Sequence, residues 1–106
     1  MNIENEELFR LAALAVGMKD KRVCKYMGVI AMEAGYGATP CYWNPLKNDA
    51  EAFRLAVDLN IVTRQVGAHV MATVNGIQLD QYVDECRRAA TRRVIVRAAA
   101  LIGGTL

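Results

Sequence analysis

The sequence predicts a single α+β domain over residues 1–106, in which three helices pack on a small, mostly antiparallel sheet of three or four strands, in two or three layers. Three observations predict this fold. Apolar residues recur at helical spacing in three separate segments. An Asn-Gly pair lies between two β-prone runs, which is the pattern of a hairpin. A chain of 106 residues can bury one core but hardly two, so one cooperative unit is expected.

The composition is that of a folded domain without a strong electrostatic bias. Hydrophobic residues make up 54% and charged residues 23% of the chain, and the net charge is only +2, so a nucleic-acid function would depend on where the charges lie. Cys24, Cys41 and Cys86 are odd in number and show no paired spacing, which favours a reducing compartment. The acidic first residues do not resemble a signal peptide. We therefore expect a cytoplasmic protein.

The first helix is expected from Glu4 to Val16, with an acidic first turn and Gly17 as its C-cap. Its apolar positions are Leu8, Leu11, Ala12 and Ala15. After a basic turn, residues 23–32 mix β-branched, aromatic and small side chains, which suit either a strand or a helix. A strand around Tyr26–Met32 is favoured.

Residues 33–45 are expected to form an ordered loop, because glycines and prolines interrupt regular structure while aromatic side chains anchor it. These aromatic side chains are Tyr36, Tyr42 and Trp43. Trp43 beside Pro45 could serve as a ligand platform or as the centre of a protein interface. The favoured interpretation is structural: Trp43 and Leu46 fix the loop to the core, and Asn44-Pro45 turns the chain into the next helix.

The second helix is expected to begin after Asn48, because Asn48 and Glu51 have the spacing of a capping box. Its apolar stripe consists of Ala52, Leu55, Ala56 and Leu59. Asn60 is expected to end the helix, since asparagine tolerates the left-handed conformation of a C-cap.

A hairpin is expected in the segment that follows. Residues 61–66 are β-prone, and the runs 70–74 and 77–79 flank Asn75-Gly76, whose positive φ angles suit a type I′ turn. The three runs supply the main sheet.

The register of this hairpin follows from its turn. If Val74 lies opposite Ile77, then Ala72 lies opposite Leu79 and Val70 falls on the same face, which is expected to be core. The other face then carries His69, Met71, Thr73, Gln78 and Tyr82. His69 is expected to stack beside Tyr82.

The last helix is expected to open at Asp84 and Glu85, to run to Ile102 and to stop at Gly103-Gly104. Its apolar arc consists of Thr91, Val94, Ile95, Ala98, Leu101 and Ile102. The rest of its circumference carries Arg88, Arg92, Arg93 and Arg97. The helix is therefore expected to pack on one side and to be basic on the other.

The second and last helices resemble the small phage and prophage proteins of the phage α-β-α (ABA) sandwich family. The residues that carry the resemblance are Trp43-Asn44-Pro45-Leu46, Asp49, Ala52, Arg54-Leu55-Ala56-Val57, Leu59, the run from Ala90 to Ala99, and Gly103. The resemblance covers about a third of the chain directly. It implies an α-β-α sandwich-like fold and a phage origin, and it brings no catalytic residues with it.

Most enzyme chemistries lack their residues here, so we expect a protein that is not an enzyme and has no metal or other cofactor. The chain contains no serine, and its one histidine would have to meet one of three scattered cysteines. Closely spaced zinc ligands are missing, and Gly35-Tyr36-Gly37 lacks the rest of a phosphate loop. Asp80, Asp84 and Glu85 fit the start of a helix better than a cation site.

Binding is the remaining class of function, and the arginines of the last helix are its main candidates. Arg88 and Arg92, like Arg93 and Arg97, lie four residues apart, where like charges are mildly destabilising unless something offsets them. Acids within the fold, phosphates of DNA or RNA, or an acidic protein surface would each do so. Solvated or internally paired arginines are favoured.

The leading hypothesis is a small, phage-encoded, non-enzymatic accessory protein that binds a host or phage macromolecule, with anti-defence or host-takeover activity as one purpose. Its partner is expected to be a host or phage protein in the cytoplasm of the bacterial host. One alternative is a nucleic-acid-binding module that uses the last helix. Another is a small-ligand or nucleotide binder with its pocket under the Tyr36–Trp43 loop. A homodimer through the hairpin edge also stays open.

Overall fold

The computed structural model describes residues 3–16, 23–26, 29–32 and 44–105. The elements in chain order are α1 (Ile3–Ala15), β1 (Val23–Tyr26), β2 (Val29–Met32), α2 (Asp49–Leu59), β3 (Val62–Val66), β4 (His69–Val74), β5 (Ile77–Tyr82) and α3 (Arg87–Gly104). Strands β3, β4 and β5 form one antiparallel sheet in that order, and β1 and β2 form a separate antiparallel pair. The expected α+β fold is confirmed.

Residues 23–26 and 29–32 are β-structure rather than helix, but they form two strands where one was expected. Val23 pairs with Met32 and Tyr26 with Val29, so the chain reverses between the two strands. The predicted single strand over 26–32 is therefore wrong in extent. Gly28 divides the β-prone run in the sequence, and a glycine weakens a strand interior.

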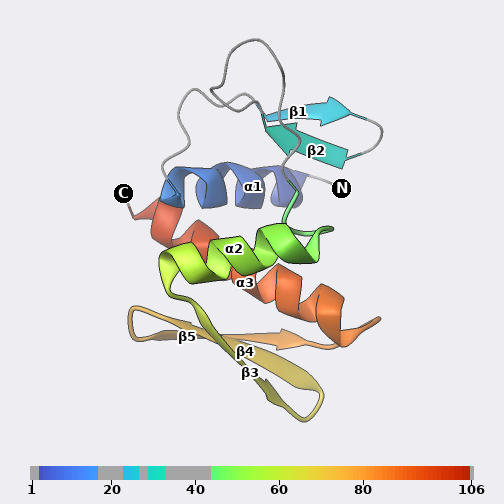
Figure 1. Ribbon diagram of the computed structural model, residues 1–106, viewed down its shortest axis with the longest axis vertical. Helices are drawn as coiled ribbons and strands as arrows, with labels where there is room; N and C mark the ends of the chain where they lie inside the picture. Colours follow the sequence, from blue (N-terminus) through green and yellow to red (C-terminus); the bar gives the residue numbers. More distant parts are fainter. Residues whose placement is uncertain (1–2, 17–22, 27–28, 33–43, 106) are drawn as a thin grey trace.

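Helix α3 occupies the centre of the fold (Figure 1). The sheet lies on one side of α3, α1 packs along the other side, and α2 lies beside α3. Its buried residues are Ala90, Val94, Ile95, Val96, Ala98, Ala99, Ala100 and Gly103. The prediction of one packed side and one basic side is wrong, because neighbouring elements contact α3 on several sides. Leu101, which was assigned to the core, is 38% exposed.

The sheet presents one face to the helices. Val70, Ala72 and Val74 of β4 are buried on this face, and the pairings Val74 with Ile77 and Ala72 with Leu79 confirm the expected register. The turn between these strands has positive φ angles at Asn75 and Gly76, as a type I′ turn requires.

The outer face of the sheet carries the residues expected there. His69 lies opposite Tyr82, and their rings meet edge to face with centroids 5.5 Å apart. The stacking of these two side chains is confirmed.

Helix α2 has the expected boundaries and stripe. The side chain of Asn48 accepts a hydrogen bond from the backbone N–H of Glu51 at 3.0 Å, and Asn60 adopts the left-handed conformation with φ 57°. Ala52 and Leu55 are buried, and Ala56 and Leu59 pack against the core.

The ends of α3 differ from the prediction. Asp84 and Glu85 precede the helix, and Cys86 is its N-cap, with Sγ accepting from the Ala89 N–H at 3.4 Å. At the other end, the helix continues through Gly103 and Gly104, so these glycines do not stop it.

Gly103 has a packing role instead of a capping role. A Cβ atom at this position would lie 1.7 Å from the backbone oxygen of Leu11 in α1, so only glycine permits this approach of the two helices. Helix α1 itself runs one residue earlier than expected, from Ile3 to Ala15, and its predicted cap Gly17 lies outside the described residues. In the part of the chain that the structure describes, no helix is both long and apolar enough to cross a membrane.

Candidate functional site

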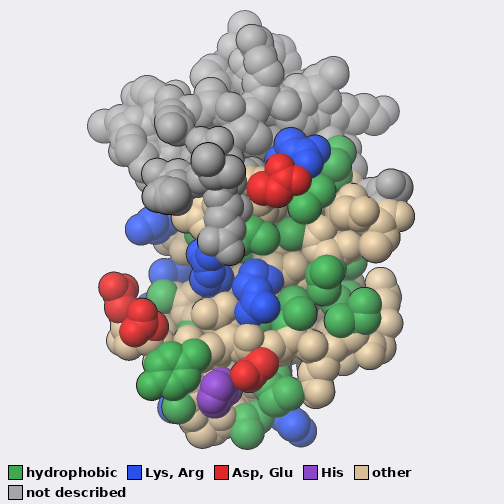
Figure 2. Space-filling view, turned by 180° about the vertical axis from the view of Figure 1, so that it is seen from behind, with side chains coloured by type: hydrophobic (Ala, Val, Ile, Leu, Met, Phe, Trp, Pro, Cys, Tyr) green, Lys and Arg blue, Asp and Glu red, His purple; other side chains and the backbone are tan. Residues whose placement is uncertain are grey.

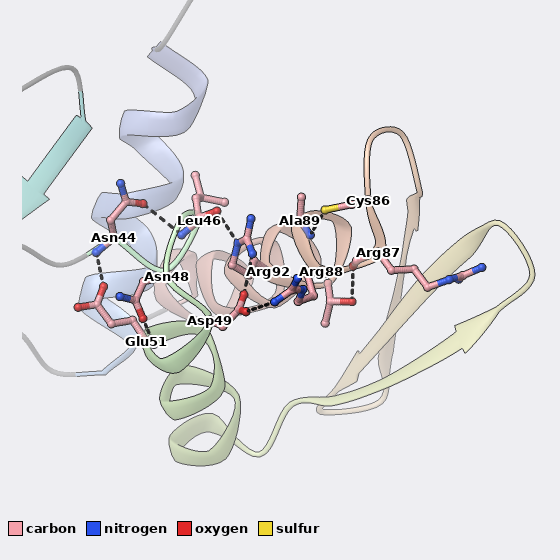
Figure 3. Close-up of polar contacts among 11 residues, drawn as sticks. Asn44, Leu46, Asn48, Asp49, Glu51, Cys86, Arg87, Arg88, Ala89 and Arg92 are labelled. Atoms are coloured by element: carbon pink, nitrogen blue, oxygen red, sulfur yellow. Dashed lines mark hydrogen bonds and ion pairs between the residues drawn. The ribbon is translucent and has the colours of Figure 1, made fainter.

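Arg92 of α3 is bonded within the fold, where it joins α3 to the start of α2. Its Nε donates to the carbonyl of Leu46 at 2.8 Å and its Nη1 donates to Oδ1 of Asp49 at 2.6 Å (Figure 3). Nη1 of Arg88 lies 3.5 Å from the other oxygen of Asp49. The hydrogen bond from Arg92, together with the positive charges of Arg92 and Arg88, holds the pKa of Asp49 below its ordinary value.

Arg93 and Arg97 are also bonded within the fold. Nη1 of Arg93 donates to the side-chain oxygen of Asn5 in α1 at 3.1 Å. Nη1 of Arg97 donates to the backbone carbonyl of Asp80 at 2.9 Å and to the side-chain oxygen of Gln81 at 3.0 Å. The arginines of α3 thus tie it to α1, to α2 and to β5, and two of them use neutral oxygens where acids were expected.

Arg87 and Arg88 remain exposed at the start of α3. The side chain of Arg88 is 82% exposed. Arg87 points away from the Asp49 cluster, which consists of Asp49, Arg88 and Arg92, in Figure 3. Lys and Arg side chains on the face seen in Figure 2 are interleaved with acidic and apolar ones.

The chain before α2 is held by side-chain and backbone bonds. The backbone N–H of Asn44 donates to Oε1 of Glu51, and the N–H of Leu46 donates to Oδ1 of Asn44 at 3.2 Å. Pro45 is fully buried. The turn expected at Asn44-Pro45 and the packing of Leu46 on the core are confirmed, although Glu51 reaches back to Asn44 and not to the N-cap residue Asn48. Tyr36, Tyr42 and Trp43 lie outside the described residues.

Among the described residues, the side chains able to act as nucleophiles, acids or metal ligands do not come together in a catalytic centre. Nδ1 of His69 is shielded from solvent and lies 2.9 Å from a carboxylate oxygen of Asp80, without the alignment of a hydrogen bond. Cys86 is exposed and caps α3. Across the described ranges, no group of three His, Cys, Asp or Glu residues is placed to hold a metal ion.

A groove of about 700 Å³ lies between α2, β3 and the first half of α3. Its apolar lining consists of Ala52, Phe53, Ala56, Val57, Ile61 and Ile95, and its polar lining of Asp49, Asn60, Thr63, Gln65, Arg88, Thr91 and Arg92. Helix α2 packs on α3 but makes little contact with β3, so the groove runs between α2 and β3. This volume is in the range of known ligand sites.

Two large apolar side chains of α2 stand at the groove without being covered. Phe53 is 67% exposed and Val57 is 60% exposed, and they lie one helical turn apart. The sequence interpretation missed them. The available signal was an apolar pair at i,i+4 outside the stripe assigned to the core.

The outer edge of β3 borders the same groove, and no described strand pairs with it. The turn at Gly67 and Ala68 makes Val66 and His69 a pair that exchanges both hydrogen bonds, and pairing then alternates along the antiparallel ladder. The N–H and C=O groups of Thr63 and Gln65 therefore point away from β4. Both residues also line the groove.

No protein-family model, curated protein or solved structure matches this chain.

Proposed function

We propose that the protein is a non-enzymatic accessory domain that binds another protein through the groove between α2, β3 and α3. The observation that carries this proposal is that exposed Phe53 and Val57 lie at the same groove as the edge of β3, with which no described strand pairs. Exposed aromatic and aliphatic side chains beside a concave apolar surface are typical of protein interfaces. A phage origin and a host or phage partner belong to the same proposal, and the resemblance to the phage ABA sandwich proteins supports them. A cytoplasmic location belongs to it as well, supported by the unpaired spacing of the cysteines, with an anti-defence or host-takeover activity as one purpose.

A nucleic-acid function through α3 has less support from the geometry. Arg92, Arg93 and Arg97 already donate hydrogen bonds to described residues, so each offers a phosphate only its remaining N–H groups, and the side chain of Arg92 is only 19% exposed. The exposed pair Arg87 and Arg88 is a small surface for a polyanion.

The proposal is tested by affinity capture from a lysate of the bacterial host. The Kd is then measured for each captured protein after purification. The groove variant combines Phe53→Ser with Val57→Ser, and the control is Ile77→Ser, which changes an apolar side chain that is 49% exposed outside the groove. We expect a nuclease-resistant partner whose Kd rises at least tenfold for the groove variant and stays unchanged for the control.

Equal binding by the wild type and the groove variant would show that the interface lies elsewhere. Loss of binding after nuclease treatment would favour nucleic acid instead. Both variants should remain folded, because they replace exposed side chains.

A further inference from the structure

We propose that the groove takes an extended segment of its partner as a fourth strand, antiparallel to β3, with apolar side chains at alternate positions and an acidic side chain between them. This inference rests on the function proposed above and adds the chemistry of the partner. Strand addition to an open sheet edge is an established mode of peptide recognition.

The backbone of β3 supplies the first part of the site. The N–H and C=O groups of Thr63 and Gln65 face away from β4, two residues apart, which is the spacing at which an antiparallel strand forms its hydrogen-bonded pairs. The opposite edge of the sheet differs, because Arg97 donates to the Asp80 carbonyl of β5. At the β3 edge, none of the hydrogen bonds among the described residues uses an outward backbone group of Thr63 or Gln65.

The groove supplies the apolar specificity. Residues directly opposite each other in a sheet point to the same face, so partner residues opposite Thr63 and Gln65 would enter the groove. There they would meet Ala56 from α2 and the exposed side chains of Phe53 and Val57. Helix α2 would then cover the added strand, as α3 covers β4.

Arg64 supplies the charge specificity. It lies between Thr63 and Gln65, so its side chain and that of the partner residue opposite it fall on the outer face of the sheet. Arg64 is exposed, and it forms no ion pair with a described residue. Opposite charges at directly opposed positions stabilise strand pairing, so an acidic residue fits this position. Within the groove lining, Arg88 and Arg92 outnumber the one acid, Asp49.

A second copy of the chain fits this edge less well. The antiparallel register that pairs all five residues of β3 with another β3 places Arg64 directly opposite Arg64. Like charges at such positions are destabilising. The partner is therefore a different segment with an acidic centre.

The first experiment is a selection of random peptides displayed for binding to the wild-type protein, with counter-selection on the Phe53→Ser/Val57→Ser variant. We expect enrichment of short segments in which an aspartate or glutamate lies between two apolar residues. Enrichment of apolar residues at helical spacing would overturn strand addition and leave the groove as the binding site. No enrichment over the variant would count against both the strand proposal and the proposed function.

The second experiment uses a synthetic peptide with valine, glutamate and valine at its centre, measured by fluorescence anisotropy. Gln65→Pro removes one outward N–H without touching the ladder to β4, and Gln65→Ala is the matched control that keeps this N–H. We expect Gln65→Pro to raise Kd at least tenfold and Gln65→Ala less than threefold. Replacing the central glutamate by lysine should weaken binding to the wild type and strengthen binding to Arg64→Glu.

N-methylated peptides provide the same test on the unaltered protein, in case Gln65→Pro does not fold. Methylation of a valine nitrogen that faces β3 should abolish binding, whereas methylation of the glutamate nitrogen, which faces away, should leave Kd within threefold. Equal effects of the two methylations would overturn the proposed strand. So would a wild-type dimer at micromolar concentration that Gln65→Pro converts to a monomer, because the second copy would then occupy the edge.

Discussion

Helix α3 and the groove beside β3 differ in whether their most prominent side chains have partners within the fold. Helix α3 carries the arginines that the sequence offers as binding candidates. Of these, Arg92, Arg93 and Arg97 donate hydrogen bonds to neighbouring parts of the fold. The groove has few charges, but it leaves Phe53 and Val57 exposed. A high density of charged residues along a sequence therefore does not by itself indicate a binding surface. What distinguishes a binding surface is groups without partners in the fold.

The largest effect that would test this comparison concerns Gly103. Gly103→Ala places a Cβ atom against the backbone of Leu11, so α1 and α3 must move apart, and we expect a loss of about 3 kcal/mol in the free energy of unfolding. The matched control is Gly104→Ala, because a Cβ atom there meets nothing within 4 Å. The control should gain less than about 1 kcal/mol, because Gly104 is the last residue of the helix and the full difference in helix propensity applies only to interior positions. Urea denaturation measures both variants.

If Gly103→Ala and Gly104→Ala had the same stability, the close contact between α1 and α3 would be contradicted. The role of α3 as the central helix would then need revision.

The second effect compares two arginines of α3. Arg92→Ala leaves the carbonyl of Leu46 and the carboxylate of Asp49 without their donor, and we expect it to cost about 2 kcal/mol. Arg88→Ala removes a side chain that is 82% exposed, and its effect should be below about 0.5 kcal/mol. Thermal unfolding of the two variants distinguishes a structural arginine from a solvated one. Similar losses for both would show that the hydrogen bonds of Arg92 add no more to stability than the exposed side chain of Arg88 does.

The smallest effect is the pH dependence of the Asp49 cluster. Because the pKa of Asp49 is lowered in the folded state, its contribution to stability is present above the ordinary aspartate pKa and is lost as the pH falls through its folded pKa. The difference in Tm between the wild type and Asp49→Asn should therefore be largest at neutral pH and shrink in acid. The effect is small, since the carboxylate is half exposed.

The pKa of Glu7 is also lowered, by its hydrogen bond with Arg10, so Glu7 adds its own pH dependence to stability. The contribution of the Arg92–Asp49 pair is separated from that of Glu7 by repeating the measurement in an Arg92→Ala protein. In an Arg92→Ala background, Asp49→Asn should have a much weaker effect on Tm, with little pH dependence. An unchanged pH dependence in that background would show that Arg92 is not its cause.

The local features of the fold were predictable from the sequence, because they depend on neighbouring residues. Asn48 acts through its side chain on the N–H three residues later, and Asn60 and the Asn75-Gly76 turn act through their own backbone conformation. Each of these predictions is confirmed. The pairing of β4 and β5 follows from that turn, since a two-residue turn allows only one register.

The features that failed depend on contacts distant in the sequence. Helical periodicity gives the apolar arc of α3, but it does not say how many elements surround the helix, so the buried side was underestimated. Gly103 lies at the end of an apolar run, where a glycine usually marks a C-cap, and only the position of Leu11 reveals its packing role. The candidate groove was missed for the same reason, because Thr63 and Phe53 are brought to one groove by the fold and not by a sequence motif.

The central position of α3 also has a consequence for synthesis. Helix α1, α2 and the sheet are translated first, yet each packs against a helix that comes last among the described elements. Until Arg87–Gly104 has left the ribosome, the nascent chain cannot bury the apolar sides of these elements. Complete burial of the core therefore requires α3, and the apolar sides of the earlier elements stay exposed until α3 has been translated.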